Sequence, residues 1–441
     1  MLAVVLVVLN LGLVFVLLAL PFGTRTVRQS RVIAAGRRRL WEALWPFGKH
    51  ADWSGARIAA EPFGDDGLTR IRLGWEGRDG KPIEHVVRLE NVVEGERFSM
   101  RVVDDSSLET AFWSHFRDDV ELAGEDGAVR VTLSRTDRYR GAAFLIFRYF
   151  ALRRELGKLQ VWAQTGRYRA GGLFEHPLSQ FGLACVSVLI MWPIFGLTVG
   201  GFVLAAVLTL VVALHELGHM AAFRVAGHRT ARMIFVPLLG GIAIGGRPYD
   251  SRFEVAFVAL MGAGFSAFIV PLAIAACDFS ASEGWRFAAS VFATLAGIAA
   301  LFNLANLVPV WKFDGGQVLR QICPGPVSLA VASFVLLSAV LALGYMAGFP
   351  AHLLVVAGAI FAVLSLITAG SGVRPRHELK AMSVPERAAL AAALVAVITV
   401  HAGGMLWASA RLDDWQSYER QRHATTISAS LLPERGMTDS E

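Results

Sequence analysis

The stretch VVALHELGHM, residues 211–220, lies within a long apolar run and decides how the rest of the chain is interpreted. On a helix, His215 and His219 are four residues apart, so both imidazoles project from one face. This spacing allows two nitrogens to bind one zinc ion, with Glu216 beside them as a base for a water molecule. Ionisable side chains at membrane depth are costly, so their presence here indicates a functional site.

Two simpler interpretations of this pentad stay open. A chain of this composition contains H-E-x-x-H by chance in roughly one case in a hundred, so the motif needs structural context. Histidines in membrane helices also form hydrogen bonds between helices. That second interpretation explains neither Glu216 nor the acidic motif found further along the chain.

The composition indicates a membrane protein with one soluble domain. Of 441 residues, 54% are hydrophobic and 18% are charged, whereas soluble proteins are nearer half apolar and a quarter charged. The charged residues gather between positions 25 and 170. The three cysteines have no disulfide or zinc spacing. A net charge of +6 is modest, and we expect no nucleic-acid partner.

The apolar runs predict a polytopic membrane protein with about eight transmembrane helices. Residues 1–20 form a retained anchor, and six arginines between positions 25 and 39 place the following domain in the cytoplasm. Further spans are expected at 178–198, 200–224, 254–276, 286–308, 327–347, 351–371 and 387–408, before a polar tail at 411–441. The short loops predicted to face outward lack Lys and Arg, which fits an inner or plasma membrane protein.

The segment 27–166 has the pattern of an α+β domain. A first strand at 27–35 and a short helix at 36–45 precede further alternating segments. These lie at 69–75, 85–93, 97–103, 115–122 and 129–136, with Asp-Gly and Glu-Gly turns between most of them. A long helix at 142–164 closes the domain, with Leu145, Tyr149, Leu152, Leu156 and Leu159 at helical spacing.

The order of these elements resembles that of the START-like, or SRPBCC, helix-grip domains. The resemblance rests on RVIAAGRRRLWEALWPF at 31–47, Asp52-Trp53, the run of strands and the long final helix. It implies a curved antiparallel sheet around that helix, often with a cavity for an apolar ligand. A packed regulatory domain without a ligand is the alternative.

The stretch VPLLGGIAIGG, at 236–246, is too short for a span and carries Gly and Pro. It predicts a hairpin or re-entrant loop, which membrane depth tolerates only where protein or a wet cavity satisfies its backbone. A strand edge here could pair with an extended peptide. The alternative is a simple surface loop.

A second motif, NLVPVWKFDGG at 306–316, offers a third metal ligand. Catalytic zinc usually has three protein ligands and one open position. His215 lies roughly 22 Å into its helix from the outer face at about 1.5 Å per residue. The span that ends near residue 308 runs the same way, so Asp314 reaches a similar depth. Pro309 ends the helix, and the two glycines after Asp314 let the backbone turn.

Together, HELGH and NLVPVWKFDGG resemble the motifs of the site-2 protease family of intramembrane zinc metalloproteases. The resemblance covers residues 178–322. It implies a zinc ion (Zn²⁺) bound by His215, His219 and Asp314, with Glu216 as general base. Asn306 matches the family's Asn and would hold the substrate backbone or the oxyanion. The chain departs from the family in lacking a PDZ-like segment and in carrying a START-like domain in front.

These observations lead us to expect an intramembrane zinc metalloendopeptidase that acts in or near transmembrane segments of membrane proteins. Residues 178–322 form its zinc core and 327–408 are additional membrane helices. Its partners would be a membrane-protein substrate, the bilayer and an apolar ligand in the soluble domain. One alternative is a non-proteolytic lipid- or ligand-binding membrane protein with a structural zinc site. Another is a transporter, although no symmetric pair of broken helices supports it.

Overall fold

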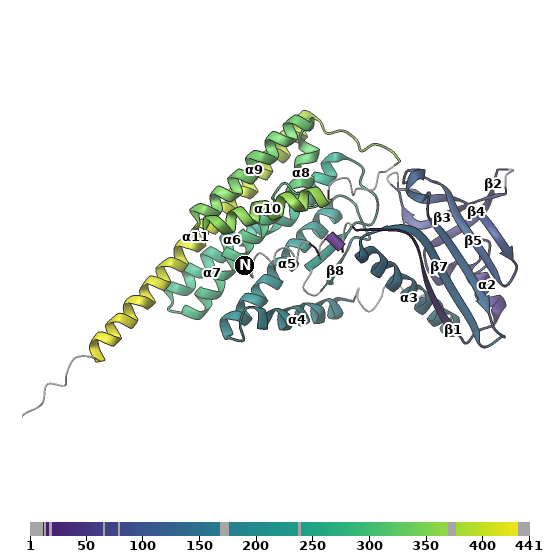
Figure 1. Cartoon of the computed structure of the whole chain (residues 1–441), viewed down its shortest axis with the longest axis horizontal. Helices are drawn as coiled ribbons and strands as arrows, with labels where there is room; N and C mark the ends of the chain where they lie inside the picture. The colour runs from purple at the N-terminus through teal and green to yellow at the C-terminus, as the bar shows by residue number, and fades with distance from the viewer. Residues whose placement is uncertain are drawn as a thin grey trace, which may run out of the picture.

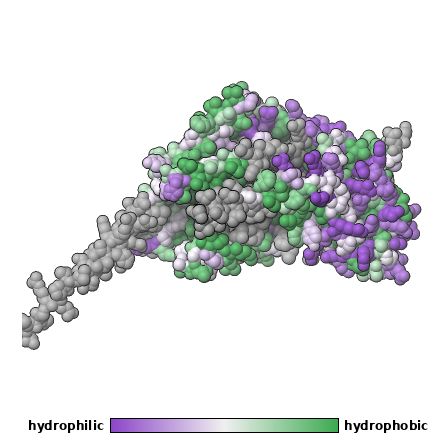
Figure 2. Space-filling model, viewed as in Figure 1, coloured by the Kyte–Doolittle hydropathy of each residue, from purple (hydrophilic) through white to green (hydrophobic). Residues whose placement is uncertain are grey.

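The computed structural model describes residues 20–430 except 65–66, 78–79, 168–175, 237–239 and 369–375, together with residues 12, 15 and 16. A sheet domain and a bundle of helices lie side by side (Figure 1). Hydrophilic residues cover much of the sheet domain, whereas hydrophobic residues gather over the helices (Figure 2). The division into a soluble domain and a membrane part is therefore visible at the surface.

The soluble domain contains a seven-stranded antiparallel sheet in the order β1-β7-β6-β5-β4-β3-β2. The strands are β1 Pro21–Ile33, β2 Arg57–Phe63, β3 Leu68–Glu76, β4 Pro82–Val93, β5 Arg97–Asp105, β6 Arg117–Ala123 and β7 Val129–Arg140. The helices are α2 Arg37–Leu44 and α3 Ala142–Thr165, with 3-10 turns at Ala51–Trp53 and Thr110–Trp113.

The long helix α3 packs its middle and last turns against this sheet. Leu152, Leu156 and Leu159 are almost fully buried on one side of α3. They join alternate residues of β7, including Val129 and Val131, in a single hydrophobic core. A sheet that packs around a C-terminal helix is the helix-grip arrangement, so the predicted architecture of this domain is confirmed.

Two details of the domain differ from the sequence prediction. Strand β2, RIAAEPF, was not predicted; its two alanines and Pro62 are poor strand formers, and it lies at the edge of the sheet, where Pro is tolerated. Tyr149 was expected on the packed side of α3, yet it is 42% exposed. The first turns of α3 therefore lie outside the core.

The membrane part contains eight described helices. Their bounds are α4 Pro177–Ile194, α5 Val199–Val225, α6 Arg252–Ser282, α7 Arg286–Asn306, α8 Asp314–Ile322, α9 Pro326–Met346, α10 Ala351–Thr368 and α11 Val384–Ser430. Six of them, all except α8 and α10, are long and apolar enough to cross a membrane. Helix α6 lies at the centre and contacts α5, α7, α8 and α11.

Three predicted segments, the anchor and the last two spans, do not match the described helices in full. Most of the anchor at 1–20 lies outside the described residues. The span expected at 351–371 corresponds to α10, whose described apolar stretch, Ala351–Ser365, is shorter than a full span. Helix α11 continues to Ser430 rather than ending near 408, because no Gly or Pro interrupts it between 405 and 430. Residues 431–441 of the expected tail lie outside the described part.

The Gly-rich stretch at 236–246 supplies the second strand of a hairpin, whose first strand begins four residues before the stretch. Strands β8 Arg232–Val236 and β9 Gly240–Ile244 pair antiparallel, with Ile234 opposite Ile242. Residues 237–239 of the motif lie outside the described residues. Strand β8 contacts α4, and β9 lies against α5, so the hairpin is anchored between two membrane helices.

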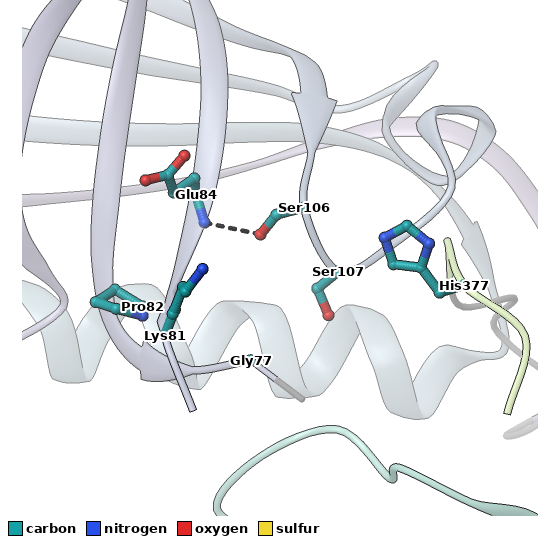
Figure 3. Close-up of a pocket in the computed structure, with 7 residues that line it drawn as sticks. All are labelled: Gly77, Lys81, Pro82, Glu84, Ser106, Ser107 and His377. Carbon is teal, nitrogen blue, oxygen red and sulfur yellow. Dashed lines mark hydrogen bonds between the residues drawn. The ribbon is translucent and has the colours of Figure 1, made fainter. Parts of the chain in front are cut away.

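A short segment before α11 joins the soluble domain to the membrane part. The guanidinium of Arg376 lies 2.7 and 2.8 Å from the two carboxylate oxygens of Asp104, and its backbone N–H donates to Ser107. Four residues later, the backbone N–H of Lys380 donates to the carbonyl of Asp250, just before α6. The carbonyl of Lys380 accepts from the N–H of Arg252, the first residue of α6. A cavity of about 450 Å³ lies at this junction, between Ser107 and His377 (Figure 3).

Asp105, next to this junction, gives the domain a pH-dependent contribution to stability. Burial would raise its pKa, but hydrogen bonds involving His85, Ser107 and Trp113 hold the pKa below the ordinary value of 3.8. A carboxyl group with a lowered pKa in the folded state stabilises the fold above its unfolded pKa. That stabilisation is lost as pH falls through the folded pKa.

We expect Asp105→Asn to destabilise the full-length protein at pH 7 by about 1–3 kcal/mol, because buried donors lose a charged acceptor. The difference from wild type should shrink below pH 3.8, as the native carboxylate takes up a proton. Thermal unfolding followed by tryptophan fluorescence measures both values. Asp104→Asn, at an exposed pair, should change stability by less than about 1 kcal/mol. An equal difference at pH 7 and pH 3 would contradict this account.

Candidate metal centre

Helix α5 carries the H-E-x-x-H residues deep into the bundle. It begins after Thr198, whose side chain accepts a hydrogen bond from the backbone of Gly201 at 3.1 Å. His215 then lies about 24 Å along the helix from Val199, at roughly 1.5 Å per residue. It is 3% exposed. His219 stands one turn further on, and the two imidazole rings meet edge to face.

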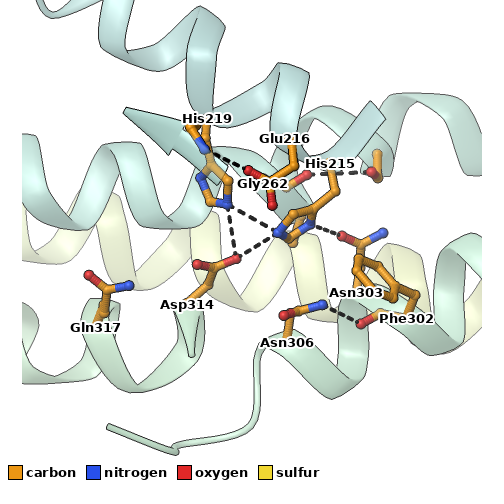
Figure 4. Close-up of polar contacts among 12 residues, drawn as sticks. His215, Glu216, His219, Gly262, Phe302, Asn303, Asn306, Asp314 and Gln317 are labelled. Atoms are coloured by element: carbon orange, nitrogen blue, oxygen red, sulfur yellow. Dashed lines mark hydrogen bonds and ion pairs between the residues drawn. The ribbon is translucent and has the colours of Figure 1, made fainter. Parts of the chain in front are cut away.

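Asp314 reaches the two histidines from another helix, as predicted. It is the first residue of α8, where the helix dipole favours a negative charge. Its Oδ2 atom lies 3.1 Å from Nε2 of His215 and 3.4 Å from Nε2 of His219 (Figure 4). Gly315 keeps an ordinary helical backbone, but a Cβ there would lie 1.7 Å from the carbonyl oxygen of Leu307. The glycine therefore serves close packing of the folded-back chain, not the turn itself.

Hydrogen bonds to the outer nitrogens orient both imidazoles. Nδ1 of His219 lies 2.8 Å from the carbonyl oxygen of Val258, which can only accept, so this Nδ1 carries the proton. Nδ1 of His215 lies 2.8 Å from Oδ1 of Asn303, whose amide nitrogen donates to Ala299. In the neutral form, each imidazole therefore presents an unprotonated Nε2 to the centre.

The centre thus brings together three hydrogen-bond acceptors. The two Nε2 atoms are 3.0 Å apart, and the buried Oδ2 of Asp314 has no hydrogen-bond donor among the described residues. Acceptors this close repel one another unless a cation lies between them. In a tetrahedral zinc site with bonds of about 2.0–2.1 Å, ligand atoms stand roughly 3.3 Å apart. The spacing of His215, His219 and Asp314 fits such an ion.

Gly262 of α6 leaves room for this arrangement. A Cβ at this position would lie 2.5 Å from Nε2 of His219 and 2.7 Å from Cε1 of His215. Any larger residue would displace the imidazoles. The three ligand atoms all lie within 4.8 Å of one another, so the helix packing itself supplies a ready-formed site.

Asn303, which the sequence analysis did not single out, supports the site directly. It is fully buried on α7 and holds His215, whereas the predicted Asn306 lies almost one turn further and donates to the carbonyl of Phe302 (Figure 4). Among the described residues, no hydrogen bond joins Asn306 to His215, His219 or Asp314, and its role stays a prediction. In the sequence, Asn303 stands out only as a polar amide within an apolar helix. Its partner, His215, is 88 positions away, so the sequence does not indicate their contact.

Glu216 lies beside the two imidazoles under the hairpin (Figure 4). Its Oε2 accepts a hydrogen bond from the backbone N–H of Ala243 in β9 at 3.0 Å. A Cβ on Gly241 would lie 2.4 Å from Cγ of Glu216, so only glycine lets β9 pass this close. The carboxylate and the edge of β9 therefore form one wall of the site.

A second buried polar cluster fixes the base of the hairpin. His228, just after α5, lies 2.6 Å from the carboxylate of Glu254 in α6, and Arg247 contacts the same oxygen at 2.9 Å. Arg247 also donates to the carbonyl of Ala226. This network ties both ends of the hairpin to the start of α6, which positions β9 over Glu216.

No protein-family profile and no curated protein matches the chain. Among solved structures, DynU16, a protein of the dynemicin biosynthetic locus, matches with 18% identity and a TM-score of 0.24, over 32% of this chain and 48% of that one. A START superfamily protein from Mycobacterium smegmatis matches with 10% identity and a TM-score of 0.25, over 32% of this chain and 99% of its own. The Aha1 dimer from Colwellia psychrerythraea matches with 10% identity and a TM-score of 0.24, over 32% and 98%.

This chain therefore spans about half the length of DynU16. At these TM-scores the likenesses carry no argument about function. The helix-grip assignment of the soluble domain rests on its own sheet order and on the packing of α3.

The contact between Asn303 and His215 predicts a specific loss of metal affinity. Asn303→Ala removes the acceptor for Nδ1 and should weaken zinc binding by about 10–100-fold. Asn303→Asp keeps an acceptor and should retain most of the affinity. Competition with a chelator of known affinity measures the change. Asn306→Ala is the matched control on the same helix and should bind zinc as wild type does; equal loss in both alanine variants would refute the role of Asn303.

Proposed function

We propose that this protein is a zinc-dependent peptidase that hydrolyses peptide bonds in or near membrane-spanning segments of other proteins. The observation that carries the proposal is the convergence of two imidazole Nε2 atoms and a carboxylate oxygen beside Glu216. This constellation lies on helices that are apolar and long enough to cross a membrane, or directly adjoins them.

The residues divide the chemical work in the following way. His215, His219 and Asp314 would hold a zinc ion, which would supply a Lewis acid to polarise a carbonyl and ease the deprotonation of a water molecule. Glu216 takes the proton from that water onto its carboxylate and delivers it to the leaving amide nitrogen. Asn303 keeps the His215 ring in its orientation through Nδ1.

The hairpin is the proposed binding edge for the substrate. The N–H of Ala243 points away from β8 toward Glu216, so the backbone of β9 faces the metal centre. A peptide that pairs with this edge would be extended, with its carbonyls close to the three ligands. A transmembrane helix hides its amides, so a substrate must unwind locally before it pairs. Asn306 would then hold the substrate backbone.

The orientation of the protein in the membrane is part of the proposal. We place the soluble domain on the cytoplasmic side, because arginines gather in the loop that carries the hairpin: Arg229, Arg232, Arg247 and Arg252. The alternative of a structural zinc site is less well supported. Structural sites normally have four protein ligands, often cysteines, whereas the described residues bring together three, with no cysteine among them.

Glu216→Gln should separate metal binding from catalysis. The amide keeps the shape of the side chain but cannot take up the proton, so we expect near-normal zinc content and at least a 10²–10⁴-fold loss of cleavage. Zinc content of the purified protein and cleavage of a reconstituted membrane substrate provide the two readouts. The control is Gln317→Ala: the side chain of Gln317 donates to the carbonyl of Lys312 nearby, and the variant should cleave normally. A Glu216→Gln protein that cuts at the wild-type rate would falsify the assignment.

A further inference from the structure

A groove of about 1170 Å³ lies between α3 and the sheet side of the soluble domain. Most of its lining comes from α3, and Ile234 of β8 also contributes. The remaining lining residues belong to the rest of the soluble domain: Arg31, Trp53, Ser54, Ala56, Trp75 and Arg135. The groove therefore lies between the soluble domain and the hairpin of the membrane part. Adjacent strands are about 4.8 Å apart, so β9, which contacts Glu216, is the immediate neighbour of the strand that lines the groove.

The lining of the groove is basic and aromatic. Arg153, Arg154 and Lys158 of α3 line the groove and carry positive charge. Two further cations line the groove from the sheet. Arg31 donates to the side chain of Gln160, and Arg135 forms ion pairs with Asp118 and with Glu155, the one acidic residue of the lining. The groove therefore carries excess positive charge, which favours an anionic occupant.

The apolar and basic parts follow one another along α3. Phe147 and Phe150 come first and are 64% and 57% exposed. The backbone of Gly141, at the start of α3, donates to the carbonyl of Leu20, where the first apolar run ends. Phe147 and Phe150 thus lie at the end of the groove nearer to Leu20, and Lys158 lies further along α3. A chain that leaves the membrane with apolar residues first and acidic residues next would match this order.

The length of the groove suits an extended peptide. Its lining on α3 runs from Phe147 to Val161, which is about 21 Å at 1.5 Å per residue. An extended chain rises about 3.3 Å per residue, so roughly six residues fit.

We propose that this groove binds an acidic segment of the substrate protein, on the soluble-domain side, immediately beyond the membrane segment that is cleaved. The inference rests on the proposed peptidase function, since the hairpin links the groove to the metal centre. Segments next to the membrane on the cytoplasmic side are usually rich in Lys and Arg. A requirement for acidic residues there would exclude most membrane proteins, so the groove would act as a selectivity site.

Binding can be tested without cleavage, in full-length Glu216→Gln protein in phosphatidylcholine nanodiscs. Two fluorescent twelve-residue probes share the same apolar residues; one carries Glu and the other Lys at the remaining positions. We expect the Glu probe to bind at least about tenfold more tightly by anisotropy, with affinity that falls as salt rises. Arg153→Glu combined with Lys158→Glu should weaken that binding at least about tenfold.

The matched control is Arg88→Glu combined with Arg130→Glu, two exposed cations of the same sheet domain outside the groove; it should bind as the parent does. Arg153→Gln with Lys158→Gln should give an intermediate loss, and unchanged zinc content and melting temperature show that each variant is folded. Equal binding of both probes, or equal loss in the control, overturns the proposal. So does displacement of the Glu probe by phosphatidylserine vesicles at a lipid concentration where phosphatidylcholine vesicles have no effect, because the groove would then bind a lipid headgroup.

A second readout separates this proposal from the peptidase itself. With active protein and a membrane substrate that carries an acidic segment, Arg153→Glu with Lys158→Glu should raise KM at least about tenfold and leave kcat nearly unchanged. If no substrate is cleaved but the Glu probe still binds selectively, the peptidase function fails and the acidic-peptide site stands. If cleavage proceeds with the same KM for acidic and basic segments, the groove proposal fails alone.

Discussion

The structure of the membrane part depends on the need to hold three electron-rich groups together in an apolar bundle. His215 and His219 come from α5, the acceptors for their outer nitrogens come from α6 and α7, and Asp314 comes from α8. Bare acceptors at this separation would repel one another in a medium of low polarity. Residues of four helices thus meet in one small cluster, and the proposed cation would balance its charge.

The sequence predicts those residues of the site whose positions depend on local spacing and on depth along a helix. The pairing of His215 with His219 follows from the helix period, and Asp314 follows from the direction of α7 and the break at Pro309. The sequence does not predict the role of Asn303. This residue is 88 positions from His215, and their contact depends on how α5 and α7 face each other. Strand β2 was missed for a related reason: its composition is poor, and only pairing with β3 makes it a strand.

The hairpin shows how much the role of a loop depends on its supports. Glycine and proline in the sequence indicated a short non-helical excursion, but not that Ala243 would bond Glu216. That contact exists because Gly241 has no side chain and because His228, Arg247 and Glu254 fasten the ends of the hairpin. A polar network under the loop thereby sets the position of a backbone edge above the ligands.

The segment between α10 and α11 has a mechanical consequence. At Arg376 it is fastened to the soluble domain, and at Lys380 to the first turn of α6. The carbonyl of Val258, which orients the His219 ring, lies only about 9 Å further along that helix at 1.5 Å per residue. A force on the soluble domain would thus pass through the first turns of α6 to the ring of His219. Such a force would change the geometry of His215, His219 and Asp314.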